Sequence, residues 1–381
     1  MKIAPLVEAG PELSAGEIRR YARHLVLPEV GNLGQRRLAN ARVLCVGAGG
    51  LGSPVLMYLA AAGVGTLGIL DFDVVDETNL QRQVIHGQAD VGTKKVISAA
   101  RKIAEINPYV KVVTYDIRLD PTNVLEIFAN YDIIVDGTDN FATRYMINDA
   151  CVIAGKPCVW GSLYQFDGQA SVFWATYGPC YRCVHPTPPP AGLVPNCAEG
   201  GILGALCASI GAIQATEVIK LISGVGSPLV GSLIIYDGLE SNFEKIHIAK
   251  DPACSVCADP SSATLEKDYE SFCGAPSFAS EITAAQLATR LRSGENFQLV
   301  DVREPYEWDD SHIEGAVLIP QAEFYDGRAQ TKISHDLPVV LYCHLGIRSA
   351  HALSALKQSG FANASHLLGG IDSWDEYVRN E

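Results

Sequence analysis

A glycine-rich turn between two apolar segments is the first feature of this sequence that is able to do chemistry. A short run with the composition of a buried strand, 42–46, enters the turn, and an apolar helix follows over 54–62. The small residues of the turn are Gly47, Gly49, Gly50 and Gly52. Small residues let backbone N–H groups approach a phosphate, and the N-terminus of the new helix favours negative charge. The turn predicts a nucleotide site, although dehydrogenases and ATP-using enzymes share this pattern.

Polar and cationic residues follow the next predicted strand, 66–71. Asp71 lies 24 positions after Gly47, where a carboxylate can accept hydrogen bonds from ribose hydroxyls; a helix cap or turn residue is the alternative. The segment beyond it contributes Asp73, Asn79, Arg82, Gln83 and Lys95. Hydride transfer needs no such set, whereas a nucleoside triphosphate needs positioned donors that offset its phosphate charge. These residues favour a triphosphate over a dinucleotide.

Asp139 follows another strand of the buried type, 131–136, within the sequence Gly-Thr-Asp-Asn. A carboxylate at the carboxyl end of a strand is a suitable Mg²⁺ ligand, because hard cations take oxygen donors. Either Asp139 or Asn140 can instead cap the helix predicted over 141–154, and one residue can do both. Asp139 is therefore a candidate magnesium ligand, and both residues are candidates for the nucleotide site.

Four cysteines form two CxxC pairs, Cys180 with Cys183 and Cys254 with Cys257. Each pair can present two thiolates in one knuckle, and two knuckles make a tetrahedral Zn²⁺ site. The gap of 70 residues between the pairs exceeds that of a zinc finger, so the metal would join distant segments of one domain. Because no ligand position is left open, a structural zinc role is favoured over a redox CxxC.

Cys197 ends a proline-rich stretch, 186–197, just before a predicted helix. A thiolate is stabilised at a helix N-terminus, so Cys197 is a candidate covalent residue, and a bystander thiol is the alternative. Five other cysteines lie in apolar strands, helices or the linker and are interpreted as inert: Cys45, Cys151, Cys158, Cys207 and Cys273.

Cys343 lies between the end of a predicted strand, 338–342, and a helix expected from Ala350. Its loop contains Gly346 and Arg348, so the sulfur faces several backbone N–H groups. Such a cradle stabilises a thiolate, a persulfide or an oxyanion. A cysteine that merely caps a core strand is the alternative, and the well-formed loop argues against it.

The elements that must position these groups alternate as strand and helix through residue 160. This order predicts an α/β fold with a mostly parallel, doubly wound, Rossmann-like sheet. Ahead of the sheet, Ser14 and Glu17 form a capping-box signal for a helix over 15–25. The cations of this helix, which on spacing alone form a solvated basic face, are Arg19, Arg20, Arg23 and His24.

Length and composition limit the alternatives. A chain of 381 residues predicts two domains, and the net charge of −14 disfavours a nucleic-acid partner. No signal peptide is evident, and the apolar run 201–213 is too short to span a bilayer, so we expect a buried helix and no membrane partner. Eleven cysteines, an odd number, fit reduced thiols and a cytoplasmic location.

Together these motifs resemble the MoeB/ThiF adenylyltransferases, the bacterial relatives of the ubiquitin-activating enzymes. The resemblance covers residues 13–250 and rests on Arg20 to Arg23, Gly47 to Gly52, Asp71 with Asp73, Asn79 with Arg82 and Gln83, Lys95, Thr138 to Asn140, and the two CxxC pairs.

The MoeB/ThiF resemblance implies roles for single residues. It places Asp71 on the ribose and Asp139 on Mg²⁺. The residues that it places around the phosphates are Asn79, Arg82 and Lys95. It also implies that Arg23 is lent across a homodimer interface, in place of a solvated face. Cys197 matches a loop cysteine that some relatives use covalently and others do without.

The C-terminal part of the chain resembles a rhodanese domain, with Cys343 as the residue that carries a persulfide and Arg348 in its loop. Related phosphatases have an active loop that is longer by one residue, so the shorter loop favours sulfur transfer. A stretch rich in Ser, Ala and Pro precedes this part and is interpreted as a linker. The predicted organisation is an adenylyltransferase domain over 13–258, a linker over 259–280 and a smaller α/β rhodanese domain over 281–381.

The two resemblances predict an ATP-dependent enzyme that adenylates a small ubiquitin-like sulfur carrier, of the MoaD/ThiS kind and ending in Gly-Gly, and then converts its C-terminus to a thiocarboxylate. ATP, Mg²⁺ and Zn²⁺ are the expected cofactors, and a cysteine desulfurase or thiosulfate is the expected persulfide donor. Molybdopterin synthesis is one pathway that uses such an activator. The expected catalytic residues are Arg23, Arg82, Cys197, Cys343 and Arg348. The alternatives are an adenylyltransferase with a non-catalytic rhodanese module and an NAD-dependent oxidoreductase.

Overall fold

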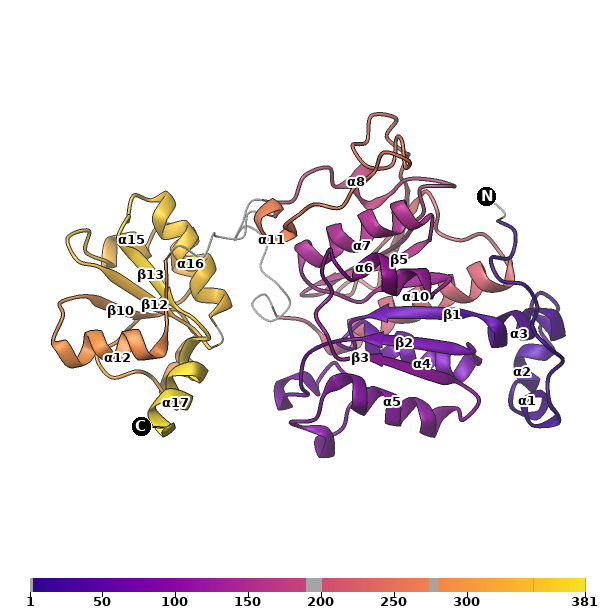
Figure 1. Cartoon of the computed structure of the whole chain (residues 1–381), viewed down its shortest axis with the longest axis horizontal. Coiled ribbons are helices and arrows are strands. Elements are labelled where there is room, and N and C mark those ends of the chain that lie inside the picture. Colours follow the sequence, from indigo (N-terminus) through magenta and orange to yellow (C-terminus); the bar gives the residue numbers. More distant parts are fainter. Residues whose placement is uncertain (1–2, 190–200, 274–279, 345, 381) are drawn as a thin grey trace. The chain divides into compact units, whose positions relative to one another are not determined.

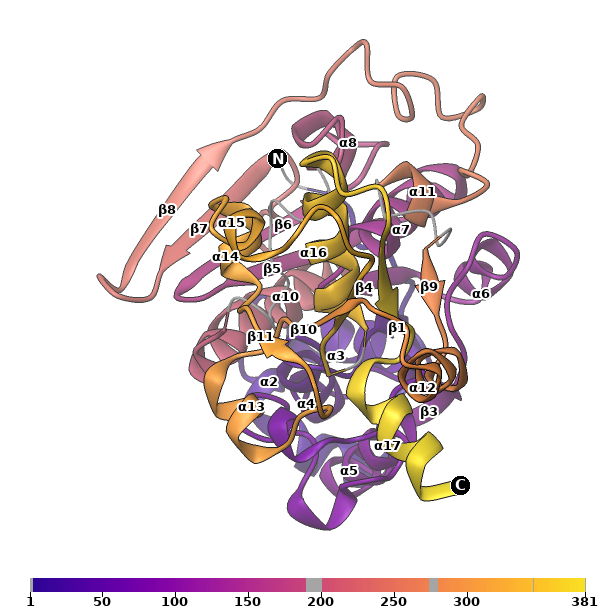
Figure 2. The same ribbon diagram turned by 90° about the vertical axis from the view of Figure 1, so that its left-hand side faces the viewer.

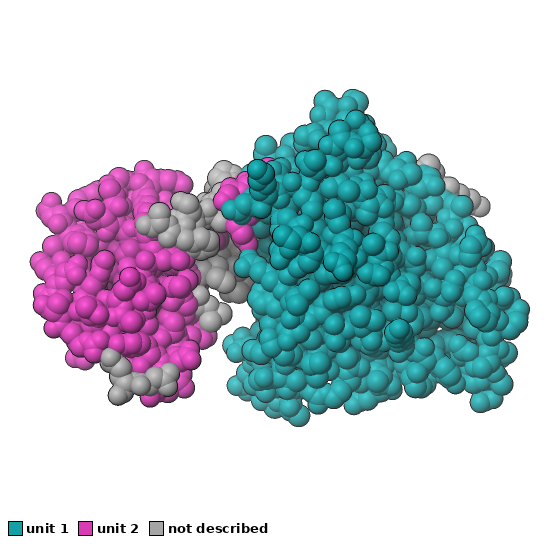
Figure 3. All heavy atoms as spheres, viewed as in Figure 1, with its two compact units in different colours: residues 1–188, 196–269 teal, residues 189–195, 270–381 magenta. Residues whose placement is uncertain are grey.

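The computed structural model describes residues 3–189, 201–273, 280–344 and 346–380 (Figure 1). The chain forms two compact units (Figure 3). Unit 1 comprises Met1–Pro188 and Asn196–Tyr269, and unit 2 comprises Pro189–Pro195 and Glu270–Glu381. Each unit has a sheet and a buried hydrophobic core of its own.

Unit 1 is built on an eight-stranded sheet. Its strands are β1 (Arg42–Val46), β2 (Thr66–Leu70), β3 (Lys111–Tyr115), β4 (Ile133–Asp136), β5 (Cys158–Tyr164), β6 (Asp167–Phe173), β7 (Ser232–Asp237) and β8 (Asn242–His247). They lie in the order β3-β2-β1-β4-β5-β6-β7-β8, with parallel pairing from β3 to β5 and antiparallel pairing from β5 to β8. Figure 2 shows β7 and β8 as a long hairpin at one edge. The predicted mostly parallel, doubly wound sheet is confirmed.

Helices cover both faces of this sheet. The helices described up to residue 223 are α1 (Ala15–Arg20), α2 (Ala22–Leu25), α3 (Gly31–Asn40), α4 (Gly52–Ala62), α5 (Lys95–Ile106), α6 (Val124–Ala129), α7 (Phe141–Ala154), α8 (Tyr181–Val184) and α10 (Gly204–Ser223), with 3-10 turns at Glu77–Asn79 and Gln88–Asp90. α4 and α5 pack on one face, and α6 and α7 lie on the other (Figure 1). α4, α7 and α10 each end at a glycine in the left-handed conformation, which closes the helix without strain: Gly63, Gly155 and Gly224.

α10 is long and apolar enough to cross a membrane, with a mean hydropathy of 1.5, but 56% of that stretch is buried inside unit 1. It packs against α4 and β5. Gln214, which is fully buried on this helix, donates to the carbonyls of Asp136 at 2.9 Å and Val159 at 3.2 Å. α10 is therefore a core helix of unit 1, as expected from the apolar run 201–213.

The helix predicted over 15–25 is broken into α1 and α2 at Tyr21. The capping box of Ser14 and Glu17 is present ahead of α1. Tyr21 is buried, and its hydroxyl accepts a hydrogen bond from Asn107 Nδ2 at 2.8 Å. This contact between distant parts of the chain fixes the break, and no local pattern reveals it.

Unit 2 is built on a five-stranded sheet with parallel pairings. Its strands are β9 (Glu281–Ile282), β10 (Gln298–Asp301), β11 (Val317–Leu318), β12 (Val339–Tyr342) and β13 (Ala364–Leu367), in the order β11-β10-β12-β13-β9. Its helices are α12 (Ala284–Ser293), α13 (Pro305–Asp310), α14 (Ala322–Tyr325), α15 (Ala329–Lys332), α16 (Ile347–Gln358) and α17 (Gly370–Asn380). α16 begins earlier than the expected Ala350, because Gly346 at φ +92° turns the chain directly into the helix.

The segment predicted as a linker, 259–280, is partly anchored on unit 1. Tyr269, the first residue of α11 (Tyr269–Phe272), donates its hydroxyl to Asp149 Oδ2 at 2.8 Å. Asp149 is fully buried and also accepts hydrogen bonds from Arg182 at 2.9 and 2.6 Å. This buried group joins α7, α8 and the start of α11. The domain boundaries expected from the sequence stay a prediction.

Candidate functional site

A cavity of about 220 Å³ lies at the carboxyl ends of β1, β2 and β4. β1 pairs with β2 on one side and with β4 on the other, so the direction of the strand order reverses at this point. Open α/β sheets bind ligands at such a reversal. We call this cavity the nucleotide cavity, since the glycine-rich turn forms part of its wall.

The glycines of the turn are needed for different structural reasons. Gly47 has φ +96°, a conformation that side chains disfavour. A Cβ at Gly52 would lie 2.0 Å from the carbonyl oxygen of Gly47, so α4 can start here only without a side chain. Gly49 and Gly50 line the cavity and leave its wall open to a ligand.

Asp71 directly follows β2 and lies in the wall of the nucleotide cavity. Its Oδ2 accepts a hydrogen bond from the backbone N–H of Ala48 at 2.8 Å, and its Oδ1 accepts one from Asp73 at 2.9 Å. Each carboxylate oxygen has a second lone pair. The turn role and the ribose role, which were alternatives in the sequence, are therefore compatible.

Lys95 and Arg82 bring positive charge to the same wall. Lys95 is 6% exposed, and its Nζ pairs with Asp73 Oδ2 at 2.8 Å. Arg82 donates from Nη1 to the carbonyl of Thr78 at 3.1 Å, and the buried Gln83 lies next to it. A polyanion that enters the cavity would meet both cations.

Two other predicted residues do not line the cavity. Asn79 Oδ1 accepts a hydrogen bond from the backbone N–H of Asp76 at 3.4 Å and so closes a 3-10 turn. Arg23 is an exposed side chain on α2. The roles that the family resemblance implies for them stay predictions.

Asn140 and Asp139 divide the two tasks that the sequence left open. Asn140 caps α7, where its Oδ1 accepts from the backbone N–H of Thr143 at 2.9 Å. Asp139 is exposed in the cavity wall, and within the described ranges its carboxylate makes no hydrogen bond or ion pair. This carboxylate fits a hard cation such as Mg²⁺.

Sequence reasoning missed Arg144, which is buried in the cavity wall. Its Nη1 donates to Ser162 Oγ and its Nη2 to the Thr138 carbonyl, each at 3.0 Å. The guanidinium also lies 5.8 Å from the rings of Phe141 and Trp160. The signal in the sequence is weak: Arg144 is the single cation of a largely buried helix. Further lining residues that can offer a polar atom or a thiol, and that were given no role at this site, include Arg118, Thr143 and Cys207.

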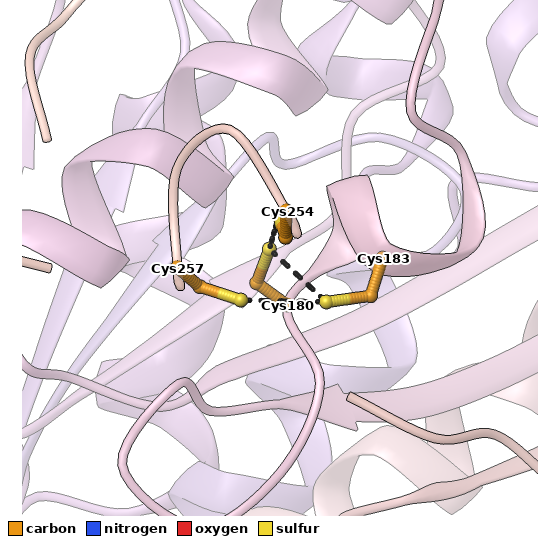
Figure 4. Close-up of side chains that lie close together, drawn as sticks. All are labelled: Cys180, Cys183, Cys254 and Cys257. Carbon is orange, nitrogen blue, oxygen red and sulfur yellow. Dashed lines mark hydrogen bonds between the residues drawn. The ribbon is translucent and has the colours of Figure 1, made fainter. Parts of the chain in front are cut away.

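The two CxxC pairs meet in unit 1, and their sulfur atoms all lie within 4.8 Å of one another (Figure 4). The Sγ of Cys180 is 3.9 Å from that of Cys183 and 3.6 Å from that of Cys254, and Cys183 is 3.3 Å from Cys257. Tetrahedral zinc with Zn–S bonds of about 2.3 Å sets its sulfurs about 3.8 Å apart. The four cysteines therefore fit a structural Zn²⁺ site.

The cluster already favours a thiolate. Hydrogen-bond donation from the thiols of Cys180, Cys183 and Cys254 lowers the pKa of Cys257 to about 5. The reverse holds for Cys180, whose pKa is raised by its bond to Cys257 and by burial. A metal cation bound by these four sulfurs would offset the negative charge of this thiolate.

The remaining cysteines divide by burial. Cys45, Cys151, Cys158 and Cys207 are buried, and Cys273 is partly exposed. Burial raises the pKa of Cys45 well above its ordinary value, which fits an inert thiol. Cys197 lies outside the described residues.

Cys343 follows β12 and heads a loop that runs to Arg348, here called the sulfur loop. Its Sγ is 1% exposed and accepts a hydrogen bond from the backbone N–H of Gly346 at 3.1 Å. Ser349 Oγ lies 3.6 Å from the same sulfur. The loop is held in place because the backbone N–H of Ile371 donates to the Cys343 carbonyl at 2.8 Å. Of the several backbone N–H donors predicted around Cys343, the described part of the loop supplies one, from Gly346, and the Ser349 hydroxyl is a second donor.

A carboxylate from another element holds the Arg348 side chain in place. Its Nη1 and Nη2 donate to the two carboxylate oxygens of Glu307 on α13, each at 2.6 Å. Burial opposes the charge of Arg348, but these bonds raise its pKa above the ordinary value. Burial also opposes the charge of Glu307, and Arg348 brings the net pKa of that carboxyl below its ordinary value. A second loop residue also has an acidic neighbour, since His344 Nε2 lies 2.8 Å from Asp372 Oδ1.

Comparison with known proteins finds two families along the chain. Residues 21–256 match the ThiF family, and residues 283–377 match the rhodanese-like domain. The "Probable adenylyltransferase/sulfurtransferase MoeZ" of Mycobacterium tuberculosis is 53% identical over 99% of this chain and 97% of that protein. The mouse "Adenylyltransferase and sulfurtransferase MOCS3" is 40% identical over 95% and 86%, respectively. A "Sulfur carrier protein adenylyltransferase" of Thermus thermophilus is 49% identical over 68% of this chain and 97% of its own length.

Solved structures resemble about two thirds of the chain. Escherichia coli MccB crystallised with AMPCPP and MccA is 25% identical, with a TM-score of 0.57 over 64% of this chain and 75% of that chain. MccB with MccA-N7isoASN is 24% identical, with a TM-score of 0.58 over 65% and 76%, which is a likeness in fold.

Proposed function

The chain belongs to the ThiF family, with a rhodanese-like domain joined to it, and we propose from this that it adenylates the C-terminal glycine of a small ubiquitin-like sulfur-carrier protein and then gives that carrier sulfur. The chain is an enzyme with adenylyltransferase and sulfurtransferase activities, the two that its near-full-length relatives carry in their names. It uses ATP, as its family does. The name of the Thermus relative supports a sulfur carrier as the substrate.

One observation carries the adenylation proposal: Asp71, Lys95 and Asp139 all line one cavity at the reversal point of the sheet. We assign Asp71 to the ribose, and Lys95 and Arg82 to the phosphates. Asp139 would hold Mg²⁺, which supplies further positive charge against the triphosphate. An NAD-dependent oxidoreductase has no use for these cations.

The carrier carboxylate attacks the α-phosphate of ATP, which gives an acyl-adenylate and releases pyrophosphate. No protein nucleophile takes part. The chain binds the two reactants in line and offsets the charge that develops on the phosphates. The buried Arg144 adds a fixed positive charge to this wall.

Sulfur transfer starts from a persulfide on Cys343, supplied by a desulfurase or thiosulfate. The terminal sulfur attacks the carbonyl of the acyl-adenylate, AMP leaves, and an acyl disulfide joins the carrier to Cys343. A second thiol, for which Cys197 is the candidate, attacks the Cys343 sulfur and releases the carrier thiocarboxylate. The resulting protein disulfide is returned to thiols by an external dithiol. The chemistry needs reduced cysteines, which supports a cytoplasmic location.

We also propose a homodimer in which Arg23 serves the nucleotide cavity of the second copy. Arg23 does not line the cavity of its own chain. Large apolar side chains are exposed on and beside α1, α2 and α3, which supports an interface there: Ile18 at 45%, Val26 at 71%, Leu27 at 46% and Leu33 at 51%.

Exchange of labelled pyrophosphate into ATP tests the adenylation proposal. The chain is mixed with ATP, Mg²⁺ and a small protein that ends in Gly-Gly, and the same carrier without its last glycine is the control. Label is expected in ATP only with the intact carrier. Exchange without any carrier, or no exchange with any diglycine-ended carrier, contradicts the proposal.

A further inference from the structure

A line of polar side chains lies beneath Cys343 in unit 2 and has no part in the mechanism so far. Ser349 on α16 is fully buried, and His366 on β13 is 4% exposed. Ser349 Oγ lies 3.6 Å from Cys343 Sγ and 3.3 Å from His366 Nδ1. On the other side of the ring, His366 Nε2 lies 3.5 Å from Glu281 Oε1. A buried polar line of this kind needs a reason, since each member costs free energy to desolvate.

Ser349 has one hydroxyl proton and three acceptors within reach. The third acceptor is the carbonyl oxygen of Gly346, at 3.0 Å. Rotation about the Cβ–Oγ bond aims the proton at one acceptor at a time and moves no heavy atom. The hydroxyl can therefore change partners inside a packed core.

His366 is an acceptor for this hydroxyl and not a base for the thiol. Burial lowers the pKa of His366 to about 4, whereas an ordinary cysteine thiol titrates near about 8.5. Transfer of a proton from the thiol to the ring is unfavourable by about four pKa units, so the ring stays neutral.

Glu281 favours one tautomer of that neutral ring. Its Oε1 is buried, makes no hydrogen bond in the part of the chain that the structure describes, and lies 3.5 Å from His366 Nε2. The nearness of this acceptor favours a proton on Nε2, which leaves Nδ1 as the acceptor that faces Ser349.

We propose that Ser349 is a positioning residue that switches its hydroxyl donor between His366 and Cys343. While Cys343 is a thiol, the proton of Ser349 points to His366 Nδ1 or the Gly346 carbonyl. When Cys343 is a thiolate, the proton turns to its Sγ, because a hydrogen bond to an anion is about twice as strong as a neutral one. The hydroxyl keeps its proton throughout, and the thiol proton leaves to solvent.

Other charges of unit 2 are unchanged by this switch. Arg348, which is paired with Glu307 from α13, acts electrostatically on the Cys343 sulfur, and the charge of Lys357 from α16 acts on His366. Two further pairs in the same unit are His344 with Asp372 and Asp301 with Arg303. Most of these are paired, so the Ser349 proton is the mobile donor beside the sulfur. Ser349→Ala and Ser349→Thr leave all of them in place, which makes the two variants a matched pair.

The test is the pH profile of Cys343 alkylation in the full-length chain. Iodoacetamide labelling is followed on the peptide that contains Cys343, since ten other cysteines are present. In Ser349→Ala the midpoint of the profile is expected to rise by about one pH unit, which lowers the rate at neutral pH by about tenfold. In Ser349→Thr, which keeps the hydroxyl, the midpoint is expected to stay within about 0.3 units of the native value.

His366→Leu gives the opposite sign. Removal of the competing acceptor frees the hydroxyl for sulfur, so the midpoint is expected to fall by about 0.5 units. A core that was merely loosened would shift both variants in the same direction. The proposal is overturned when Ser349→Ala keeps the native midpoint, or when His366→Leu raises the midpoint as Ser349→Ala does.

This inference rests on the proposed sulfur-bearing role of Cys343, but its test needs neither ATP nor a carrier. A negative alkylation result would leave the sulfur-transfer proposal standing. Loss of thiocarboxylate formation while the alkylation profiles are as expected would contradict the sulfur-transfer proposal and leave this inference standing.

Discussion

The nucleotide cavity of unit 1 and the sulfur loop of unit 2 use charge in opposite ways. In the cavity, Lys95 pairs with Asp73, whose side chain is 50% exposed, and the Asp139 carboxylate makes no ion pair within the described ranges. In the sulfur loop, both Nη atoms of Arg348 are bonded to Glu307, and these two side chains are only 20% and 15% exposed.

The difference follows from what each site must stabilise. A triphosphate brings several negative charges and then loses part of them as pyrophosphate, so its site needs cations and acids that can change partners. A thiolate or persulfide is one small anion, and backbone N–H and hydroxyl donors are enough for it. In the sulfur loop the cation is paired within the fold, and its predicted catalytic role beside the Cys343 sulfur stays a prediction. In the nucleotide cavity we expect the cations to serve the ligand.

The largest difference between the two sites is expected when the sulfur nucleophile is removed. Cys343→Ala is expected to lower thiocarboxylate formation by at least about 10³-fold, because no other group supplies the transferred sulfur. Carrier-dependent pyrophosphate exchange is expected to stay within about twofold of the native rate. Cys273→Ala, which removes a partly exposed cysteine, is the control for both assays. Equal loss in the two assays would show that the sites are not separable.

Removal of a cation from the nucleotide cavity tests how that site uses charge. Lys95→Ala is expected to slow pyrophosphate exchange by about 10²-fold, since a positioned charge next to the phosphates is lost. Lys94→Ala is a matched control, because this neighbour is 43% exposed, pairs with Asp116 and does not itself line the nucleotide cavity. Alkylation of Cys343 by iodoacetamide should be the same in both variants. A Lys94→Ala effect as large as that of Lys95→Ala would contradict the assignment.

The zinc site tests whether the two units are stabilised independently, because its four cysteines all belong to unit 1. Cys257→Ser is expected to release the zinc and to lower the thermal transition of unit 1 by about 10 °C. Zinc content by atomic absorption and calorimetry of the full chain measure the two effects. Hydrogen exchange of the sulfur-loop peptides should not change. Native zinc content in this variant would rule out the four-cysteine site.

The smallest expected effect concerns the locked pair of the sulfur loop. Glu307→Gln is expected to destabilise α13 and α16 by about 2 kcal/mol at pH 7, as Arg348 loses its partner. The pKa of Glu307 is below its ordinary 4.5 in the folded chain, so the pair contributes fully above that pH. The contribution is lost as the pH falls below 4.5 through the lowered value.

Amide hydrogen exchange of peptides from α13 and α16 measures this effect, with Asp309→Asn as an exposed control on the same helix. The difference between Glu307→Gln and the native chain should shrink as the pH is lowered past 4.5. A difference that grows on acidification would reverse the assigned sign.

The two regions also differ in how far the sequence predicts them. The sulfur loop is contiguous, so Cys343, Gly346 and Arg348 could be read from one short stretch, but Glu307 comes from another helix and was not predicted as a partner. The family resemblance and the fold class were confirmed by the ThiF and rhodanese matches and by the sheet.

The nucleotide cavity was predicted only in part, because its residues come from several elements. Asp71 and Asp139 follow strand ends and Lys95 opens the helix α5, so these three could be anticipated from the sequence. Arg144 could not, since its position in the wall depends on how α7 packs over β4 and β5. The break at Tyr21 likewise depends on a contact with distant Asn107.

The most direct test of the account follows the carrier itself. A diglycine-ended carrier is incubated with ATP, Mg²⁺, a dithiol and the chain after its Cys343 has been converted to a persulfide, and the intact carrier is weighed by mass spectrometry. The account predicts exchange of one carrier oxygen for sulfur, dependent on both ATP and Cys343. A carrier that gains sulfur without ATP, or that becomes adenylated and never gains sulfur from the persulfidated chain, would contradict it.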